Sequence, residues 1–282
     1  MASPDLSRIA GNIAALNSLY SLQNINQSLT AAQTRLSSGK RINSAEDDPA
    51  GLRFATKFMV RAEGLQVAMD AIGDAKNLLS VTEGGLRKIN DILVKVRNKA
   101  EEAVSDTLGT EERSAISAQI TEFLGEVDTI VSQTKWNNNA LIDGTFTGKT
   151  FQIGADSGDT LSYGLSQAHD VTGTGTAGLA LSTVSVDSAV NATAYMASVA
   201  AAISTVSTSL ASVGSTMARL TFQEQNLTVA HANTEAAYNR IMNANMAREQ
   251  VEASKFLILQ QTATAMLAQA NSTPQYILSL FR

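Results

Sequence analysis

The chain has 282 residues and a formal net charge of −5, with one Trp, five Tyr, eight Phe, three Pro and no cysteine. The missing cysteines exclude disulfides, thiolate metal ligands and a cysteine nucleophile, and an acidic balance without a basic tail gives no sign of a nucleic-acid partner. Few aromatic residues and few prolines favour long helices packed along seams over a thick aromatic core.

The first predicted helix covers residues 9–34, which carry no charged side chain. Its apolar positions step by three and four residues, as one helical stripe does. With the stripe continued beyond the charge-free stretch, they are Ile9, Ile13, Leu16, Tyr20, Leu22, Ile25, Leu29, Ala32 and Leu36. The other face is polar but neutral, whereas an exposed helix usually carries charges there. We therefore expect this helix to pack against other copies or to border confined water.

The connector "RLSSGKRINSAEDDPAG", residues 35–51, follows this helix. A phosphate-binding loop would need a Gly where Thr34 stands and a Ser or Thr where Arg41 stands. We predict instead a left-handed helix cap at Gly39 and a new helix that begins at Pro49 after Asp48. The connector residues that we expect to make contacts with a neighbour are Arg41, Asn43, Asp47, Asp48 and Gly51.

Two further helices are expected, over 49 to about 106 and over 110–134, the second capped by Thr110. Four glycines weaken the first of them, because each costs up to about 1 kcal/mol relative to Ala. Its expected buried face consists of Leu78, Leu79, Val81, Leu86, Ile89, Leu93 and Val96.

Residues 145–166 change character, since two strand-like runs flank the turn-rich "GADSGD" and predict a β-hairpin. Asp156 and Asp159 lack the acidic spacing and closing Glu of an EF-hand, which favours turn chemistry over calcium. The segment from about 167 to 189 is rich in Ser, Thr, Gly and Ala, and it predicts a short exposed loop before a helix that begins near Ala189.

The C-terminal end mirrors the N-terminal one, because residues 256–281 carry no charge before Arg282. Here too the small and apolar positions step by three and four: Phe256, Leu259, Ala263, Met266 and Ala270. Two charge-free stripes at opposite ends predict that the two ends pair. No run of about 18 apolar residues predicts a membrane-spanning helix, and the N-terminus shows no ordinary secretory signal.

Candidate catalytic chemistry is absent from the sequence pattern. His169 and His231 are isolated, there is no His-Glu-x-x-His zinc helix and no nucleophile elbow is found. We therefore expect no enzyme activity and no catalytic, cofactor-binding or metal-binding residues.

With these residues placed, the chain resembles the bacterial flagellins. The connector is similar to the signature that follows the first helix of that family. The resemblance continues in residues 82–100, "TEGGLRKINDILVKVRNKA". The family's C-terminal arm resembles residues 244–282, "ANMAREQVEASKFLILQQTATAMLAQANSTPQYILSLFR". The resemblance implies a mainly α fold: an elongated antiparallel helical bundle or coiled coil built from both chain ends, with a small β-hairpin region.

The family organisation implies two domains. Residues 1–43 and 243–282 would form a terminal coiled-coil domain that lines the inner tube of a filament, and residues 44–242 would form a helical outer-tube domain with the hairpin at about 145–166 and a short variable segment at about 167–189. The ends would be disordered in the free subunit and fold on assembly. The inner-helix assembly residues are Ile9, Ile13, Leu16, Leu22, Ile25, Leu29, Leu36, Phe256, Leu259, Met266, Leu280 and Arg282.

The function implied is a structural subunit that polymerises into the flagellar filament for swimming, and the alternative is a hook-filament junction protein. Implied partners are further copies of the chain, an export chaperone on the C-terminal helix, junction proteins and the filament cap, with no nucleic acid and no membrane insertion. The protein would lie outside the cell after type III export, without a cleaved Sec signal.

One departure concerns the family's innate-immune receptor surface, which commonly reads "RVRELA" with an acidic residue on the next helix. Here the stretch is "KVRNKA", so Asn98 and Lys99 replace the Glu-Leu pair, and Gln119 stands in place of the acid. Losing an apolar anchor and reversing local charge should weaken a complementary interface. We expect weak recognition by that Toll-like receptor.

Overall fold

The computed structural model describes residues 12–171 and 178–280, which form two compact units. The first unit comprises the described parts of Met1–Val60 and Asn233–Arg282, and the second comprises those of Arg61–Ala232. Helix α2 (Pro49–Glu102) and helix α4 (Ala189–Met242) contribute residues to both. The mainly helical fold and the packing of the N-terminal helix against the C-terminal helix are as expected.

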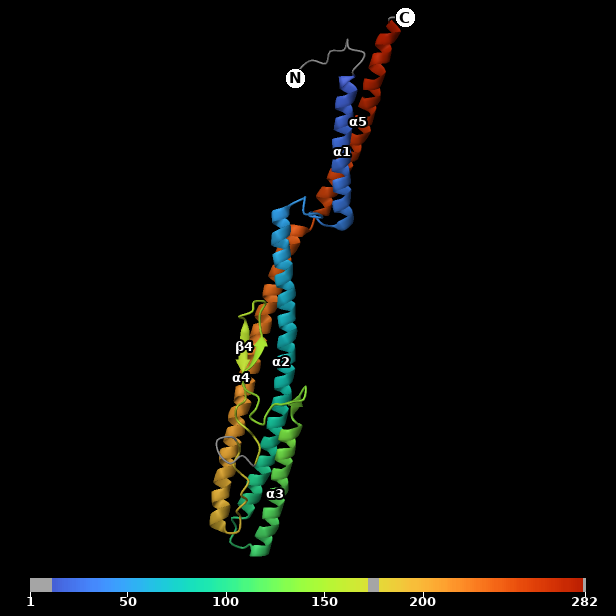
Figure 1. Cartoon of the computed structure of the whole chain (residues 1–282). Helices are drawn as coiled ribbons and strands as arrows, with labels where there is room; N and C mark the ends of the chain where they lie inside the picture. The colour runs from blue at the N-terminus through green and yellow to red at the C-terminus, as the bar shows by residue number, and fades with distance from the viewer. Residues whose placement is uncertain (1–11, 172–177, 281–282) are drawn as a thin grey trace. The chain divides into compact units, whose positions relative to one another are not determined.

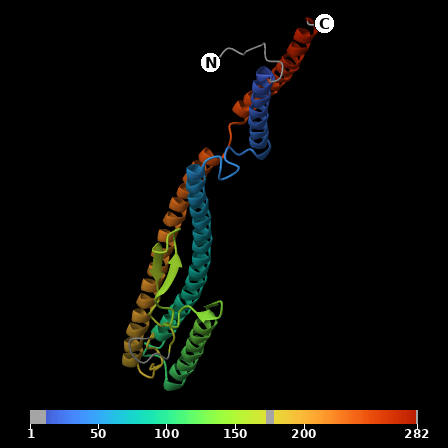
Figure 2. The same ribbon diagram turned by 45° about the horizontal axis from the view of Figure 1, so that its top comes forward.

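In the first unit, α1 (Ile13–Ser38) and α5 (Met246–Leu280) lie side by side (Figures 1 and 2). Helix α1 ends where expected, because Gly39 adopts a left-handed conformation (φ 69°) and its N–H donates to Arg35 O at 2.9 Å. Helix α2 begins at Pro49, also as expected from its preceding Asp48.

In the second unit, the part of α2 from Arg61, α3 (Thr110–Gln133) and the N-terminal part of α4 lie side by side, as the lower half of Figure 1 shows. Their apolar side chains share one core. The residues predicted to form the buried face of α2 are buried except Val81, which is 38% exposed. Val81 stands two residues after Leu79, a rotation of ~200°, and so it points away from the core. The prediction for Val81 was therefore wrong.

The start of α3 also differs from the sequence expectation. Its N-cap is Gly109 and no side chain caps it, so Thr110 is the first helical residue rather than the cap. The loop before α3 is closed instead by the buried Arg113, whose guanidinium donates to Ser105 O at 2.9 Å. A long side chain inside the first turn thus replaces the local cap.

Two small antiparallel hairpins follow α3. β1 (Lys135–Trp136) pairs with β2 (Asn139–Ala140) around Asn137 and Asn138, both at positive φ, which Asn tolerates better than most residues. β3 (Lys149–Gln152) pairs with β4 (Thr160–Tyr163) in the register Phe151↔Leu161, inside the hairpin expected at about 145–166. Leu161 and Tyr163 alternate with exposed residues, so one face of β4 joins the core.

Two glycines that seemed to weaken α2 have a packing role. A Cβ atom at Gly64 would lie 3.2 Å from the Cβ of Ala155 in the turn between β3 and β4. A Cβ atom at Gly85 would lie 2.7 Å from Oγ1 of Thr134 at the end of α3. The glycines therefore let the hairpin and α3 approach the helix, which stays continuous despite the local cost.

The segment before α4 is irregular, but several of its described side chains are buried. They are Ala168, His169, Val171, Leu179, Leu181 and Val186. The exposed loop expected from composition is thus partly a packed strap over the core. The buried residues are mostly apolar and stand singly among Ser, Thr and Gly, so the average composition of the segment does not indicate them.

His169 anchors this strap. Its ring is fully buried, with Nδ1 3.2 Å from Ile142 O and Nε2 2.9 Å from Ser209 Oγ. A carbonyl oxygen only accepts, so Nδ1 carries the proton and the Ser209 hydroxyl donates to Nε2. Burial lowers the pKa of His169 below its ordinary 6.5, against smaller raising effects of Ile142 and Asp170.

We expect the free energy of unfolding to fall as the pH drops below 6.5, because the unfolded chain then binds a proton that the folded imidazole resists. The loss is up to about 1.4 kcal/mol per pH unit until the folded-state pKa is reached. Urea unfolding of the full chain, repeated across this range, measures it. His169→Gln should flatten the acid side of the profile, and an unchanged slope in His169→Gln contradicts the prediction.

Helix α4 was not expected to qualify as a membrane span, yet by length and composition it does. Its most apolar window of 18 residues has a mean hydropathy of 1.5, and 28% of that window is buried. Ser and Thr interrupt the Ala and Val residues there, so a search for unbroken apolar runs missed it. One face of α4 lies in the core through Val199, Val206 and Val213.

Candidate functional site: the terminal helix pair and its connector

Helices α1 and α5 run antiparallel, and polar contacts fix their alignment at three levels. The contacts are Asn12 Nδ2 to Ala270 O at 2.7 Å, Gln260 Nε2 to Asn26 Oδ1 at 2.7 Å and Arg35 Nη1 to Glu249 Oε1 at 3.9 Å. The residue numbers rise along α1 as they fall along α5, which defines the antiparallel direction. Amide groups, rather than ion pairs, join most of the length of this neutral pair.

The predicted assembly residues differ widely in burial within one chain. Leu29 is buried; Leu22, Ile25, Leu36 and Phe256 are half-buried; Ile13, Leu16, Leu259 and Met266 are 54%, 50%, 38% and 60% exposed. Leu280 is the last residue of α5, and Ile9 and Arg282 lie outside the described residues. The pair thus buries its apolar stripes near the connector and leaves them largely exposed to solvent toward the N-terminal end of α1.

A hollow of about 310 Å³ lies between the two helices where the stripes are open. Its lining includes Ile25 from α1 with Leu259, Ala263 and Met266 from α5. The hollow is open to solvent, so within a single chain the apolar side chains that line it stay in contact with water.

The connector is tied to the residues just before α5 by the main chain. Arg41 N donates to Met242 O at 2.6 Å, and Ala244 N donates to Gly39 O at 2.9 Å. The Arg41 guanidinium adds bonds to Ile241 O at 3.2 Å and 3.0 Å. These bonds join segments from opposite ends of the sequence at the base of the helix pair.

A small apolar cluster supports this tie: Ile42, Ala55 and Met242, with Leu52, Tyr238 and Ile241 packed against them. Sequence reasoning treated the connector as polar and missed Ile42, which is 2% exposed. The available signal was a single β-branched apolar residue among charged neighbours. Glu249, which pairs with Arg35 across the helices and is also buried, was missed as well.

Two connector carboxylates shape the chain before α2. Asp47 Oδ2 accepts from the backbone N–H groups of Ser44 and Asn43, at 3.0 Å and 2.9 Å respectively. These two bonds lower the pKa of Asp47 below 3.8, and the charge of Arg35 contributes less. Asp48 Oδ1 caps α2 by accepting from Gly51 N at 2.8 Å. A Cβ atom on Gly51 would collide with the Asp48 carboxylate and with Ile42, which explains the glycine.

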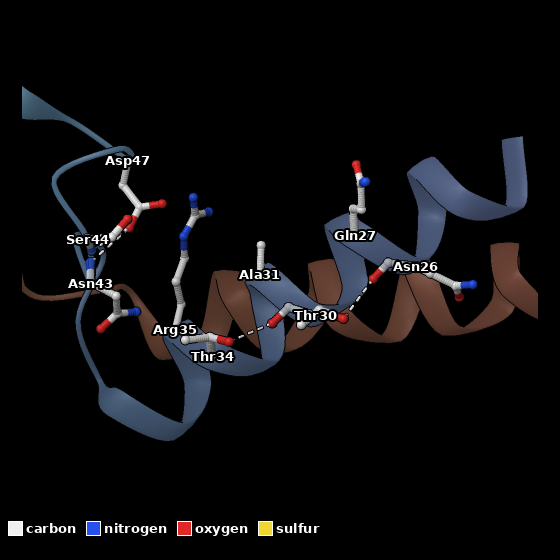
Figure 3. A pocket seen from close by; sticks show the side chains of 9 residues that line it. All are labelled: Asn26, Gln27, Thr30, Ala31, Thr34, Arg35, Asn43, Ser44 and Asp47. Atoms are coloured by element: carbon white, nitrogen blue, oxygen red, sulfur yellow. Dashed lines mark hydrogen bonds between the residues drawn. The ribbon is translucent and has the colours of Figure 1, made fainter. Parts of the chain in front are cut away.

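A polar hollow of about 530 Å³ lies between α1 and the connector. Figure 3 shows its lining: Asn26, Gln27, Thr30, Ala31, Thr34 and Arg35 from α1, and Asn43, Ser44 and Asp47 from the connector. Arg35 and Asp47 both project into it, while Thr30 and Thr34 hydrogen-bond back to the helix (Figure 3). Among the predicted connector residues, the structure therefore places Asn43 and Asp47 at this hollow, and Arg41, Asp48 and Gly51 around the tie and the cap.

The three predicted receptor-surface residues lie on neighbouring helices of the second unit. Asn98 on α2 and Gln119 on α3 are exposed, and Lys99 is partly exposed with its Nζ 2.8 Å from Glu102 Oε2. The helices pack through the adjacent buried residues Val96, Ala100, Ile116 and Ile120. All three side chains are thus at the surface, and Lys99 is already engaged by a residue of its own helix.

Comparison with known proteins covers both ends of the chain. A family model described as the bacterial flagellin N-terminal helical region matches residues 9–147, and one described as the bacterial flagellin C-terminal helical region matches residues 196–281. The chain is 31% identical to a flagellin of Listeria monocytogenes over 97% of its own length and 99% of that protein. It is 34% identical to a flagellin of Bacillus subtilis over 98% and 100% of the two chains.

A solved structure shares the fold at much lower sequence identity. A protein of Vibrio parahaemolyticus described as a flagellar hook-associated protein aligns with a TM-score of 0.59 and 13% identity, covering 70% of this chain and all of that one. At this identity the likeness concerns architecture alone.

Proposed function

Because the chain belongs to the bacterial flagellin family, we propose that its terminal helices reach their final packing only when it polymerises. The chain is a structural subunit of the flagellar filament, which lies outside the cell. The observation that supports the proposal is the exposure of large apolar side chains along the α1–α5 pair, at Ile13, Leu16 and Met266. Neighbouring copies would cover them.

The energetics are consistent with assembly-coupled packing. Each Leu, Ile or Met side chain taken out of water contributes about 1.5–3 kcal/mol. Ordering the helices costs backbone and side-chain entropy, which offsets much of this gain in a single chain. In an array of head-to-tail copies the burial repeats along the array, and heterologous contacts need not close, so the assembly grows as a filament.

We also propose the domain division that the resemblance implies. Residues 1–43 and 243–282 form the inner-tube domain and residues 44–242 the outer-tube domain, with the connector between them. The backbone tie at Gly39, Arg41 and Ala244 supports a fixed junction at the base of the terminal pair. Asn43 and Asp47, at the polar hollow, are then placed for contacts with a neighbouring subunit.

Seeded polymerisation tests the function. Purified chain is added to short filament fragments, and growth is followed by sedimentation and electron microscopy, with circular dichroism before and after. Long filaments with a gain of helical signal are expected. A stable monomer that only caps or joins fragments would favour the alternative role of a hook-filament junction protein, for which the shared fold of the Vibrio protein is the sole observation.

Further partners follow from the same role. We propose that an export chaperone binds the α5 segment before secretion, and that junction proteins and a filament cap contact the assembled chain. Export would use a type III route without a cleaved Sec signal. The family is structural rather than enzymatic, which supports the expectation that the chain carries no catalytic activity and needs no cofactor.

Weak recognition by the Toll-like receptor remains a proposal of its own. Its support is the exposed position of Asn98 and Gln119 and the pairing of Lys99 with Glu102, which leave no apolar or acidic anchor at these three positions. A reporter-cell assay measures it, with Asn98→Glu, Lys99→Leu and Gln119→Glu combined as the gain-of-signal variant. Full activation by the unchanged chain, at doses matching a strong agonist, would contradict the proposal.

A further inference from the structure

The segment before α4 packs on the core of the second unit without regular structure. We call it the 167–188 strap, and its residues 167–171 and 178–188 are described. These residues form neither a helix nor a strand ladder, although Ala168 makes an isolated bridge to Asp143. A segment of this kind opens at a lower free energy than the helices beside it, because fewer main-chain bonds break.

The strap is joined to three other segments close to His169. His169 N and Nδ1 lie 3.1 Å and 3.2 Å from Ile142 O, in the loop after β2, and Nε2 lies 2.9 Å from Ser209 Oγ on α4. Two residues later, Val171 N donates to Asp128 Oδ1 of α3 at 2.7 Å. Contacts with the loop, with α3 and with α4 are thus concentrated within three strap residues.

This arrangement is built for the neutral imidazole of His169. The neutral ring donates from Nδ1 and accepts at Nε2. A second proton, taken from solvent, would make Nε2 a donor, so the Ser209 hydroxyl would have to turn and accept. His169 is 0% exposed and Ser209 is 6% exposed, so the new positive charge would also lie out of water. Release of the strap removes both costs, because water then surrounds the imidazolium.

The charged groups around the ring do not compensate for its burial. Burial lowers the pKa of His169, and the charge of the neighbouring Asp170 raises it by a smaller amount. The carboxylates of Asp128 and Asp143 already accept hydrogen bonds, from the strap main chain and from Thr145 respectively. Helix α4 carries no Asp, Glu, Lys or Arg over residues 189–218, which include the bonding partner of the ring.

We propose that His169 is an acid-sensitive switch, which releases the 167–188 strap from the helical core when the ring takes up a second proton. The helices stay packed, because each buries residues of its own, such as Leu93 on α2, Ile120 on α3 and Leu220 on α4, all 0% exposed. Opening uncovers the apolar strap side chains and the core surface beneath them. The switch is a property of the single chain and does not depend on polymerisation.

Hydrogen exchange of the full-length chain, read by mass spectrometry, tests the switch. Rates are measured from about pH 7.5 to about pH 4.5 and corrected for the intrinsic pH dependence of exchange, in the window above the ordinary aspartate pKa. Protection of the bonded amides of His169, Val171 and Leu179 should fall by up to about tenfold per pH unit below 6.5. Protection of residues 86–96 in α2 should stay constant. A flat strap profile, or equal losses in the strap and in α2, would overturn the proposal.

Two variants separate the ring from the nearby carboxylates. His169→Gln keeps a donor and an acceptor but does not titrate in this window, so its strap protection should not change with pH. Because this variant retains Asp128 and Asp170, an acid loss that persists in it would assign the effect to those groups and refute the switch. Ser209→Ala keeps the ring and removes its α4 partner, so the strap should be less protected at neutral pH and still lose protection in acid. If the strap of His169→Gln is already open at neutral pH, Ser209→Ala decides, and a pH-independent strap in that variant refutes the proposal.

Discussion

A chain shortened to residues 1–255 should form no filaments, even with short wild-type fragments present as seeds. The truncation removes most of α5, including Phe256, Leu259 and Met266, and with it the groups that bond Asn12 and Asn26. Helix α1 then has no partner along most of its length. Its stripe stays in water, and neither the pair nor its contacts with neighbouring copies can form.

The shortened chain should nevertheless stay in solution and keep part of its fold. The core shared by α2, α3 and α4 lies within the second unit and uses no residue beyond Ala232. Circular dichroism should show a reduced helical signal with a cooperative thermal transition, while sedimentation and electron microscopy show no polymer. Full-length Gln261→Ala, changed at an exposed position, is the control and should polymerise normally. Normal filaments from the truncated chain would contradict the assignment of the assembly surface.

Leu93→Ala should destabilise the second unit by about 2–5 kcal/mol, the usual cost of cutting a fully buried leucine back to alanine. Leu93 is 0% exposed on α2, among the residues that join α2 with α3 and α4 in one core. The surrounding helices cannot close the cavity fully, so the loss exceeds the transfer energy of the deleted carbons. Urea unfolding of the full chain followed by circular dichroism measures the change.

The neighbouring residue provides the control for this prediction. Val94 is 42% exposed on the same helix turn, so Val94→Ala should change the free energy of unfolding by no more than about 0.5 kcal/mol. Comparable losses from Leu93→Ala and Val94→Ala would mean that α2 is not packed as described. Leu93 lies inside the core, so Leu93→Ala chains that stay folded at low temperature should still add to filament seeds.

Sequence patterns located the helices and their local ends well. Gly39 and the Asp48–Pro49 pair act through bonds within a few residues, so their types already imply a cap and a start. The pairing of the chain ends was also visible, because two charge-free stripes have few other ways to avoid water. Errors arose where the orientation of a single side chain decides the outcome. Val81 fits an apolar pattern but faces outward, and Arg113 replaced the expected cap of α3 by reaching Ser105 O.

In the candidate site, too, sequence patterns indicated some features and tertiary contacts decided the others. Composition and periodicity identified the stripes, but not their uneven burial, since that depends on how far α1 and α5 approach each other at each level. Ile42 and Glu249 gained their roles from segments at the other end of the sequence.

By itself, the sequence determined the helical character of the chain, the neutral stripes at both ends, the end of α1 at Gly39, the start of α2 at Pro49 and the family. These features depend on periodicity and on bonds between residues that are close in the sequence, and the order of residues determines both. Only the tertiary structure decided which apolar residues face inward, how the strap at His169 is held and which surfaces stay open for other copies. Those outcomes depend on contacts between segments far apart in the chain, because burial is a property of two surfaces that meet.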